Sequence, residues 1–200
     1  MFKWIRRSIA ILLVLFVGYQ LIQTHQAVHQ VLRYRPLVRE VLNEQDTPAN
    51  EDLILAMIYT ETKGRSADLM QSSESANGEK DSIMDSKESI RQGVQTLSDN
   101  LTEARERGVD QAAAVQAYNF GPAYLEYVEQ NGKKNSLDLA KRYSKEVVAP
   151  SLGNMTGVTY TYLTPISIWH GGQLYRNGGN YYYADLVDWN LKLIQFFSKF

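Results

Sequence analysis

The stretch 53–64, which reads Leu-Ile-Leu-Ala-Met-Ile-Tyr-Thr-Glu-Thr-Lys-Gly, decides the fold expected for this chain. Its apolar residues recur at helical spacing, and Gly64 supplies a stop. Glu61 lies four residues after Met57 and three after Ile58, so it shares their face at the end of the helix. Burial there would raise the pKa of its carboxyl group, as a general acid working near neutral pH requires. The alternative is a surface glutamate in a frayed last turn, paired with a neighbouring cation.

The rest of the globular part is predicted to be mainly α-helical. A polar stretch, 65–85, precedes a helix whose start is marked by Asp85 as N-cap and Glu88 three residues later, as in a capping box. Shorter helices are expected at 111–119, 122–130 and 137–147, and a final one at 182–200. Between 151 and 180 the composition shifts to glycine, threonine and tyrosine, which indicates a loop or a small hairpin.

The N-terminus carries a targeting signal. Lys3, Arg6 and Arg7 precede an apolar run over 9–22. Basic residues stay on the cytoplasmic side, so the remainder of the chain is expected to be exported. Because no A-x-A-like cleavage site follows, a membrane anchor over residues 1–22 is favoured over a cleaved signal peptide, which would release the domain. A buried core helix fits poorly with three cations at one end.

Residues 23–47 are expected to form a helical stalk, and 48–200 the catalytic domain. Pro36 and Pro48 interrupt the helical pattern. His25 and His29 are four residues apart, but no acidic third ligand lies nearby, so no metal site is expected there.

Composition narrows the classes of function. A chain of 200 residues suits one domain beyond the anchor, and a net charge of -1 does not suggest a nucleic-acid partner. Without cysteine, this sequence offers no disulfide, thiolate metal site or cysteine nucleophile. No metal or cofactor is expected, and the oligomeric state stays open.

Three segments together carry a family resemblance: 61–64 (Glu-Thr-Lys-Gly), 70–75 (Met-Gln-Ser-Ser-Glu-Ser) and 117–121 (Ala-Tyr-Asn-Phe-Gly). In order and spacing they resemble the lysozyme-like domains of bacterial cell-wall hydrolases of the CwlT and pneumococcal vaccine antigen A type. These are relatives of goose-type lysozyme and the soluble lytic transglycosylases. The resemblance includes 89–94 and the tyrosine-rich 178–182. Thr62 replaces the serine common after the family's glutamate, but keeps a hydroxyl group.

The resemblance implies an enzyme that cleaves peptidoglycan glycan strands outside a Gram-positive cell. Glu61 would protonate the glycosidic oxygen between N-acetylmuramic acid and N-acetylglucosamine. The residues matching the family's glycan cleft, whose polar groups would bond sugar hydroxyl or acetamido groups, are Met70, Gln71, Ser72, Ser73, Glu74, Tyr118 and Asn119.

A second catalytic carboxylate remains open. A two-carboxylate hydrolase needs one roughly 5 to 9.5 Å from the acid. A lytic transglycosylase of this family needs none, because its glutamate also deprotonates the sugar's 6-hydroxyl to give a 1,6-anhydro product. Asp68 is slightly favoured over Glu74 as the second carboxylate, and the alternative for Asp68 is a turn-forming residue that bonds its own backbone.

Two rival functions remain. One is a non-catalytic peptidoglycan-binding scaffold, against which the presence of Glu61 argues. The other is a wall peptidase, which usually needs zinc or a Cys-His pair. His170 is isolated in the sequence and fits neither.

Overall fold

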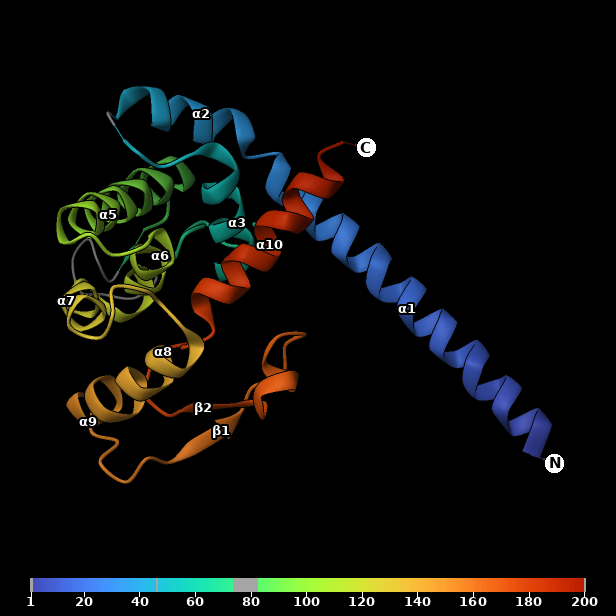
Figure 1. Ribbon diagram of the computed structural model, residues 1–200. Helices are drawn as coiled ribbons and strands as arrows, with labels where there is room; N and C mark the ends of the chain where they lie inside the picture. Colours follow the sequence, from blue (N-terminus) through green and yellow to red (C-terminus); the bar gives the residue numbers. More distant parts are fainter. Residues whose placement is uncertain (1, 46, 74–82, 200) are drawn as a thin grey trace.

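The computed structural model describes residues 2–45, 47–73 and 83–199, which form a mainly α-helical domain with one small hairpin and a long projecting N-terminal helix (Figure 1). In chain order the elements are α1 (Phe2–Leu32), α2 (Arg35–Glu44), α3 (Glu51–Glu61), α5 (Ser86–Arg107), α6 (Gln111–Phe120), α7 (Ala123–Gln130), α8 (Leu137–Tyr143), the π-helical turn η1 (Ser144–Val148), α9 (Ala149–Ser151), β1 (Thr159–Thr161), the 3-10 helix η2 (Ser167–His170), β2 (Gln173–Tyr175) and α10 (Tyr183–Phe197). The strands pair antiparallel, with Tyr160 opposite Leu174. The predicted fold class is confirmed.

The start of α5 follows the local signal in the sequence. The Asp85 side chain accepts a hydrogen bond from the backbone N–H of Glu88 at 2.9 Å. The Glu88 side chain does not complete the capping box but pairs with Arg91 at 2.8 Å. A single N-cap is therefore enough to begin this helix.

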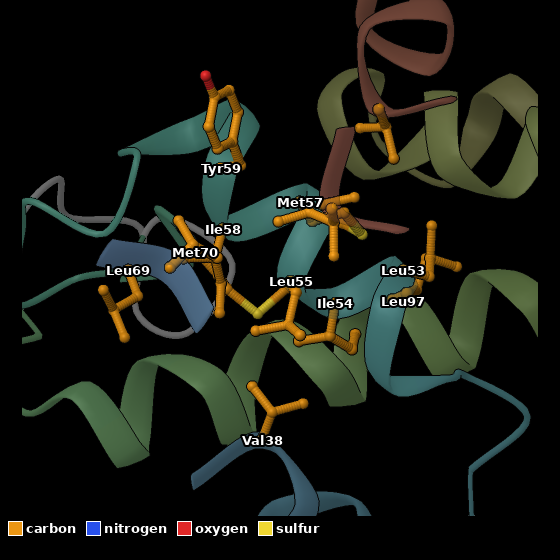
Figure 2. Packing of buried hydrophobic residues seen from close by; sticks show 14 of the residues in the cluster. Val38, Leu53, Ile54, Leu55, Met57, Ile58, Tyr59, Leu69, Met70 and Leu97 are labelled. Atoms are coloured by element: carbon orange, nitrogen blue, oxygen red, sulfur yellow. The ribbon is translucent and has the colours of Figure 1, made fainter. Parts of the chain in front are cut away.

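Helix α3 is the centre of the core. Its residues 53–59 are all buried, so the helix is apolar on every side. Figure 2 shows its side chains between Val38 of α2 and Leu97 of α5, with Met70 beside them. Burial of one such side chain contributes about 1.5 to 3 kcal/mol. The surrounding helices therefore fix α3, and with it the position of Glu61 at its end.

Several residues of the segment expected to form a stalk pack into the hydrophobic core. The segment's buried residues, which join the same cluster as α3, are Ala27, Val28, Val31, Val38 and Val41. These residues form an apolar stripe along α1 and α2. The stripe becomes part of the core because it packs against α3, α5 and α10. Since α1 runs unbroken to Leu32, the N-terminal apolar segment and the first core residues belong to one helix.

The exposed part of α1 is long and apolar enough to cross a membrane, judged by length and composition. Its best window has a mean hydropathy of 1.7, and none of that window is buried in the protein. Large apolar side chains such as Leu13 and Phe16 face outward. These properties suggest a membrane anchor.

The start of α10 joins two core clusters. Tyr182 packs in the cluster formed with α6, α7, α8 and β2, whereas Tyr183 packs in the cluster around α3. Buried Gln116 holds this turn, because its side chain donates to the Asn180 carbonyl at 2.9 Å and accepts from the Ala184 N–H at 3.1 Å. Tyr183 is thereby directed toward the end of α3.

Candidate active site

Glu61 is the last residue of α3, and its side chain is half-buried. Tyr183 donates a hydrogen bond from its hydroxyl to Glu61 Oε1 at 2.5 Å. Burial raises the pKa of Glu61 from its usual 4.5 to about 7, the Tyr183 hydrogen bond opposes this, and the negative charge of Asp68 adds to it. A carboxyl group with this pKa holds a proton near neutral pH and can donate it.

Two stacked tyrosines support the acid. The rings of Tyr118 and Tyr183 lie 6.1 Å apart, inclined by 10°. Tyr118 donates its hydroxyl proton to the Met70 carbonyl at 2.9 Å, which ties α6 to the segment after α3. Burial, together with the charge of Glu61, raises the pKa of both hydroxyls well above 10. They therefore remain neutral hydrogen-bond donors at any pH at which Glu61 titrates.

Asp68 is only 2 % exposed, and both of its oxygens are occupied. Oδ1 accepts from the Ser72 N–H at 3.0 Å and the Ser89 hydroxyl at 2.6 Å, whereas Oδ2 accepts from the N–H and the hydroxyl of Ser73. Burial alone would raise the pKa of Asp68, but these hydrogen bonds outweigh it and lower the pKa. The geometry matches the turn-forming alternative and leaves neither oxygen free to activate a water.

Three residues expected to line the glycan cleft lie in the interior. Met70, Ser72 and Ser73 are buried. Met70 packs so closely on Gly93 of α5 that a Cβ there would meet its sulfur at 2.6 Å. Their side chains pack inside the protein, and Glu74 lies outside the described residues.

Gln71 and Asn119 are exposed, as a ligand-binding role requires. Gln71 adopts a φ of 47°, a left-handed conformation that is uncommon for residues other than glycine and recurs at functional sites. The Asn119 side chain accepts from the Asn180 N–H at 2.6 Å, and Asn180 in turn donates to the Tyr162 hydroxyl at 3.2 Å. The hairpin is thus joined to the α-helical side.

Sequence reasoning missed Tyr183, Asn180 and Tyr162. The signal for Tyr183 was the run of three tyrosines where the final helix begins, but nothing local distinguishes the third from its neighbours. Tyr162 lies close enough to Glu61 for the glutamate's charge to raise its pKa, although burial is the larger cause.

A cavity of about 590 Å³ lies near the end of α3, but Glu61 is not among the residues that line it. Its walls come from Tyr59, Thr60 and Lys63 at the end of α3, the hairpin at 162–165, one face of α10, and Gln20 and Thr24 of α1. This arrangement places an open space between the α-helical part and the hairpin.

Residues 28–191 match the protein family described as Lysozyme-like. The chain belongs to the lysozyme-like family. It is 60% identical over 200 residues to pneumococcal vaccine antigen A of Streptococcus pneumoniae serotype 4, covering 100% of this chain and 98% of that protein. Over 116 residues it is 34% identical to the bifunctional muramidase/DL-endopeptidase CwlT of Bacillus subtilis, covering 58% of this chain and 34% of CwlT.

A solved structure agrees with this assignment. The lysozyme-like chain superimposes with a TM-score of 0.72 on an NLP/P60-family protein, described as similar to lipoprotein, from Staphylococcus aureus, at 36% identity. The match covers 81% of this chain and 52% of that one, so the chain spans about half the length of the solved relative.

The hydroxyl of Thr62 has a structural role in this lysozyme-like site. It donates to the Leu69 carbonyl at 2.9 Å and so joins the end of α3 to the segment that holds Asp68. Within the described ranges, no group of three or more His, Asp or Glu side chains is placed to hold a metal ion.

Proposed function

We propose that this lysozyme-like protein cleaves the glycan strands of peptidoglycan at the β-1,4 bond between N-acetylmuramic acid and N-acetylglucosamine, with Glu61 as general acid. The observation that carries the proposal is the half-buried Glu61 carboxyl, with its pKa raised to about 7 and a hydrogen bond from Tyr183. The similarity to a protein named as a muramidase supports it.

The chemistry follows from the environment of Glu61. Near pH 7 about half of the molecules carry the proton, which Glu61 gives to the glycosidic oxygen as the bond breaks. The Tyr183 hydroxyl donates a hydrogen bond that stabilises the carboxylate as it forms. Tyr183 keeps its own proton near pH 7, because its pKa is raised well above 10. Gln71 and Asn119 are the exposed groups proposed to contact the sugars.

Asp68 gives a specific reason to keep the lytic transglycosylase alternative. Since both of its oxygens accept hydrogen bonds inside the protein, it is poorly placed to act as base or nucleophile. A reaction in which Glu61 later acts as the base, and the sugar's own 6-hydroxyl attacks, needs no second carboxylate. We propose that Asp68 is a positioning residue in either reaction.

The place of action is part of the proposal. With Lys3, Arg6 and Arg7 on the cytoplasmic side, α1 would hold the domain on the outer face of the cell membrane. The substrate would then be peptidoglycan, which lies on that side.

The test is mass spectrometry of fragments released from purified peptidoglycan by the full chain in detergent. Glu61→Gln removes the transferable proton with little change in shape, and Glu106→Gln, at an exposed site on α5, is the matched control. The wild type and the control are expected to release muropeptides, and Glu61→Gln to release none. Reducing muramic ends establish a hydrolase, and 1,6-anhydro ends a lytic transglycosylase.

Two results would contradict the proposal. Full activity in Glu61→Gln would remove Glu61 from the chemistry. No product from the folded wild type would favour a peptidoglycan-binding module.

A further inference from the structure

The loop between the two strands presents large apolar side chains to the outside. Trp169 is 85% exposed, Leu163 is 70% exposed and Ile168 is 59% exposed. Isolated exposed apolar residues are common on soluble surfaces, but a cluster within one short loop marks an interaction site. The question is which partner covers this loop.

The loop is held in shape by its own hydrogen bonds. Its base is closed by the Tyr162 N–H, which donates to the Gly172 carbonyl at 2.8 Å. Inside it, the Ser167 hydroxyl donates to the Tyr162 carbonyl at 2.6 Å and accepts from the Thr164 N–H at 2.7 Å. These hydrogen bonds fix the backbone from which the apolar side chains project.

The position of the loop along α1 identifies the partner. Leu163, Thr164 and Pro165 line the same cavity as Gln20 and Thr24 of α1, and Gln20 lies within the apolar run 9–22. Figure 1 agrees, because the loop lies on the side of the hairpin that faces α1. The loop thus reaches the level at which α1 would leave the hydrocarbon layer.

The connection between α1 and the domain is stiff. From Gln20 to Ala27, the first buried core residue, α1 is continuous and rises about 10 Å. Gln30 of α1 also donates to the Gly64 carbonyl at 2.9 Å, next to the end of α3. A domain joined in this way keeps one height and one tilt relative to the membrane.

We propose that the 163–169 loop is a second membrane contact, in which Leu163, Ile168 and Trp169 enter the interfacial layer of the leaflet from which α1 emerges. The proposal rests on α1 crossing the membrane. Tryptophan favours the interface between hydrocarbon and headgroups, where its ring is partly buried and its N–H stays near water. Two contacts would fix both the height and the rotation of the domain about α1.

The experiment uses the full chain reconstituted in phosphatidylcholine vesicles with or without brominated acyl chains. In Trp4→Phe/Trp189→Phe, Trp169 is the only tryptophan, and its emission is excited selectively over that of the tyrosines. Its emission is expected to shift to shorter wavelength and to lose intensity in brominated vesicles. The two controls are built in a variant in which all three tryptophans are replaced by Phe. One control carries Lys134→Trp, between α7 and α8, and the other carries Val14→Trp, within the anchor.

Lys134→Trp is expected to show neither change, and Val14→Trp to show strong quenching. Quenching of Val14→Trp without quenching of Trp169 overturns the loop proposal while the anchor stands. Lack of quenching at both sites overturns the anchor and the loop proposal together. A Trp169 response to soluble glycan fragments but not to brominated lipid would assign the loop to substrate and also overturn it.

A second measurement avoids the tryptophan substitutions. Because the chain has no cysteine, Ile168→Cys accepts a single nitroxide label, with Lys134→Cys as control. The label at 168 is expected to be more accessible to oxygen and less accessible to a water-soluble nickel complex than the label at 134. Equal accessibility at the two sites would overturn the proposal.

Discussion

Replacing Glu61 with Gln is expected to stabilise the protein at alkaline pH and to have a smaller effect at acid pH. One pKa unit corresponds to about 1.36 kcal/mol. A carboxyl group whose pKa rises from 4.5 when unfolded to about 7 when folded therefore destabilises the folded state by about 3 kcal/mol once it is charged. The sign follows from proton binding, since the folded protein holds this proton more tightly and loses stability as pH rises from 4.5 through 7.

The assay is urea unfolding of the full chain in detergent, followed by the aromatic circular dichroism of the domain. The free energy of unfolding of Glu61→Gln minus that of the wild type is expected to be about 3 kcal/mol larger at pH 9 than at pH 4. Gln can still accept the hydrogen bond from Tyr183, so the comparison isolates the charge. The control Glu106→Gln should show no such change between the two pH values. A Glu61→Gln difference that is the same at pH 4 and pH 9 would refute the buried, proton-holding carboxyl.

Three further predictions concern the surroundings of Glu61. Tyr183→Phe removes a hydrogen bond that lowers the pKa of Glu61, so the alkaline limb of kcat/KM against pH should move up by about one unit; an unmoved or lowered limb would argue against Glu61 as the acid. Asp68→Asn should lower the free energy of urea unfolding at pH 7 by about 2 to 4 kcal/mol, because the amide nitrogen cannot accept the bonds made to a carboxylate. Since the pKa of Asp68 is lowered by folding, that cost should shrink as pH falls below about 4, and a cost independent of pH would contradict a charged Asp68. Gly93→Ala should lower the free energy of unfolding by about 1 to 3 kcal/mol in the same assay, because the added Cβ would clash with Met70. Gly18→Ala is the control, since a Cβ at that position meets nothing within 4 Å and should have no such effect. Equal effects of the two substitutions would disprove the tight contact.

Local patterns in the sequence were enough to predict most of the helices and the position of Glu61 at the end of α3. The Asp85 cap and the unbroken apolar run of α3 act over a few residues, so they are visible without a fold. The expectation that Gln71 and Asn119 contact the glycan came from the family resemblance, and their exposure is compatible with it.

The sequence by itself determined a mainly α-helical domain with a membrane-type N-terminal helix, because propensity, capping and hydropathy depend on near neighbours. The lysozyme-like assignment came from the family resemblance of 61–64, 70–75 and 117–121. Only the tertiary structure decided that Tyr183, 122 residues away, donates to Glu61. It also decided that Asp68 binds inward and that Ala27, Val28, Val31, Val38 and Val41 belong to the core. These facts depend on which surfaces meet when α1, α3 and α10 pack, and the burial that sets the pKa of Glu61 exists only after that packing.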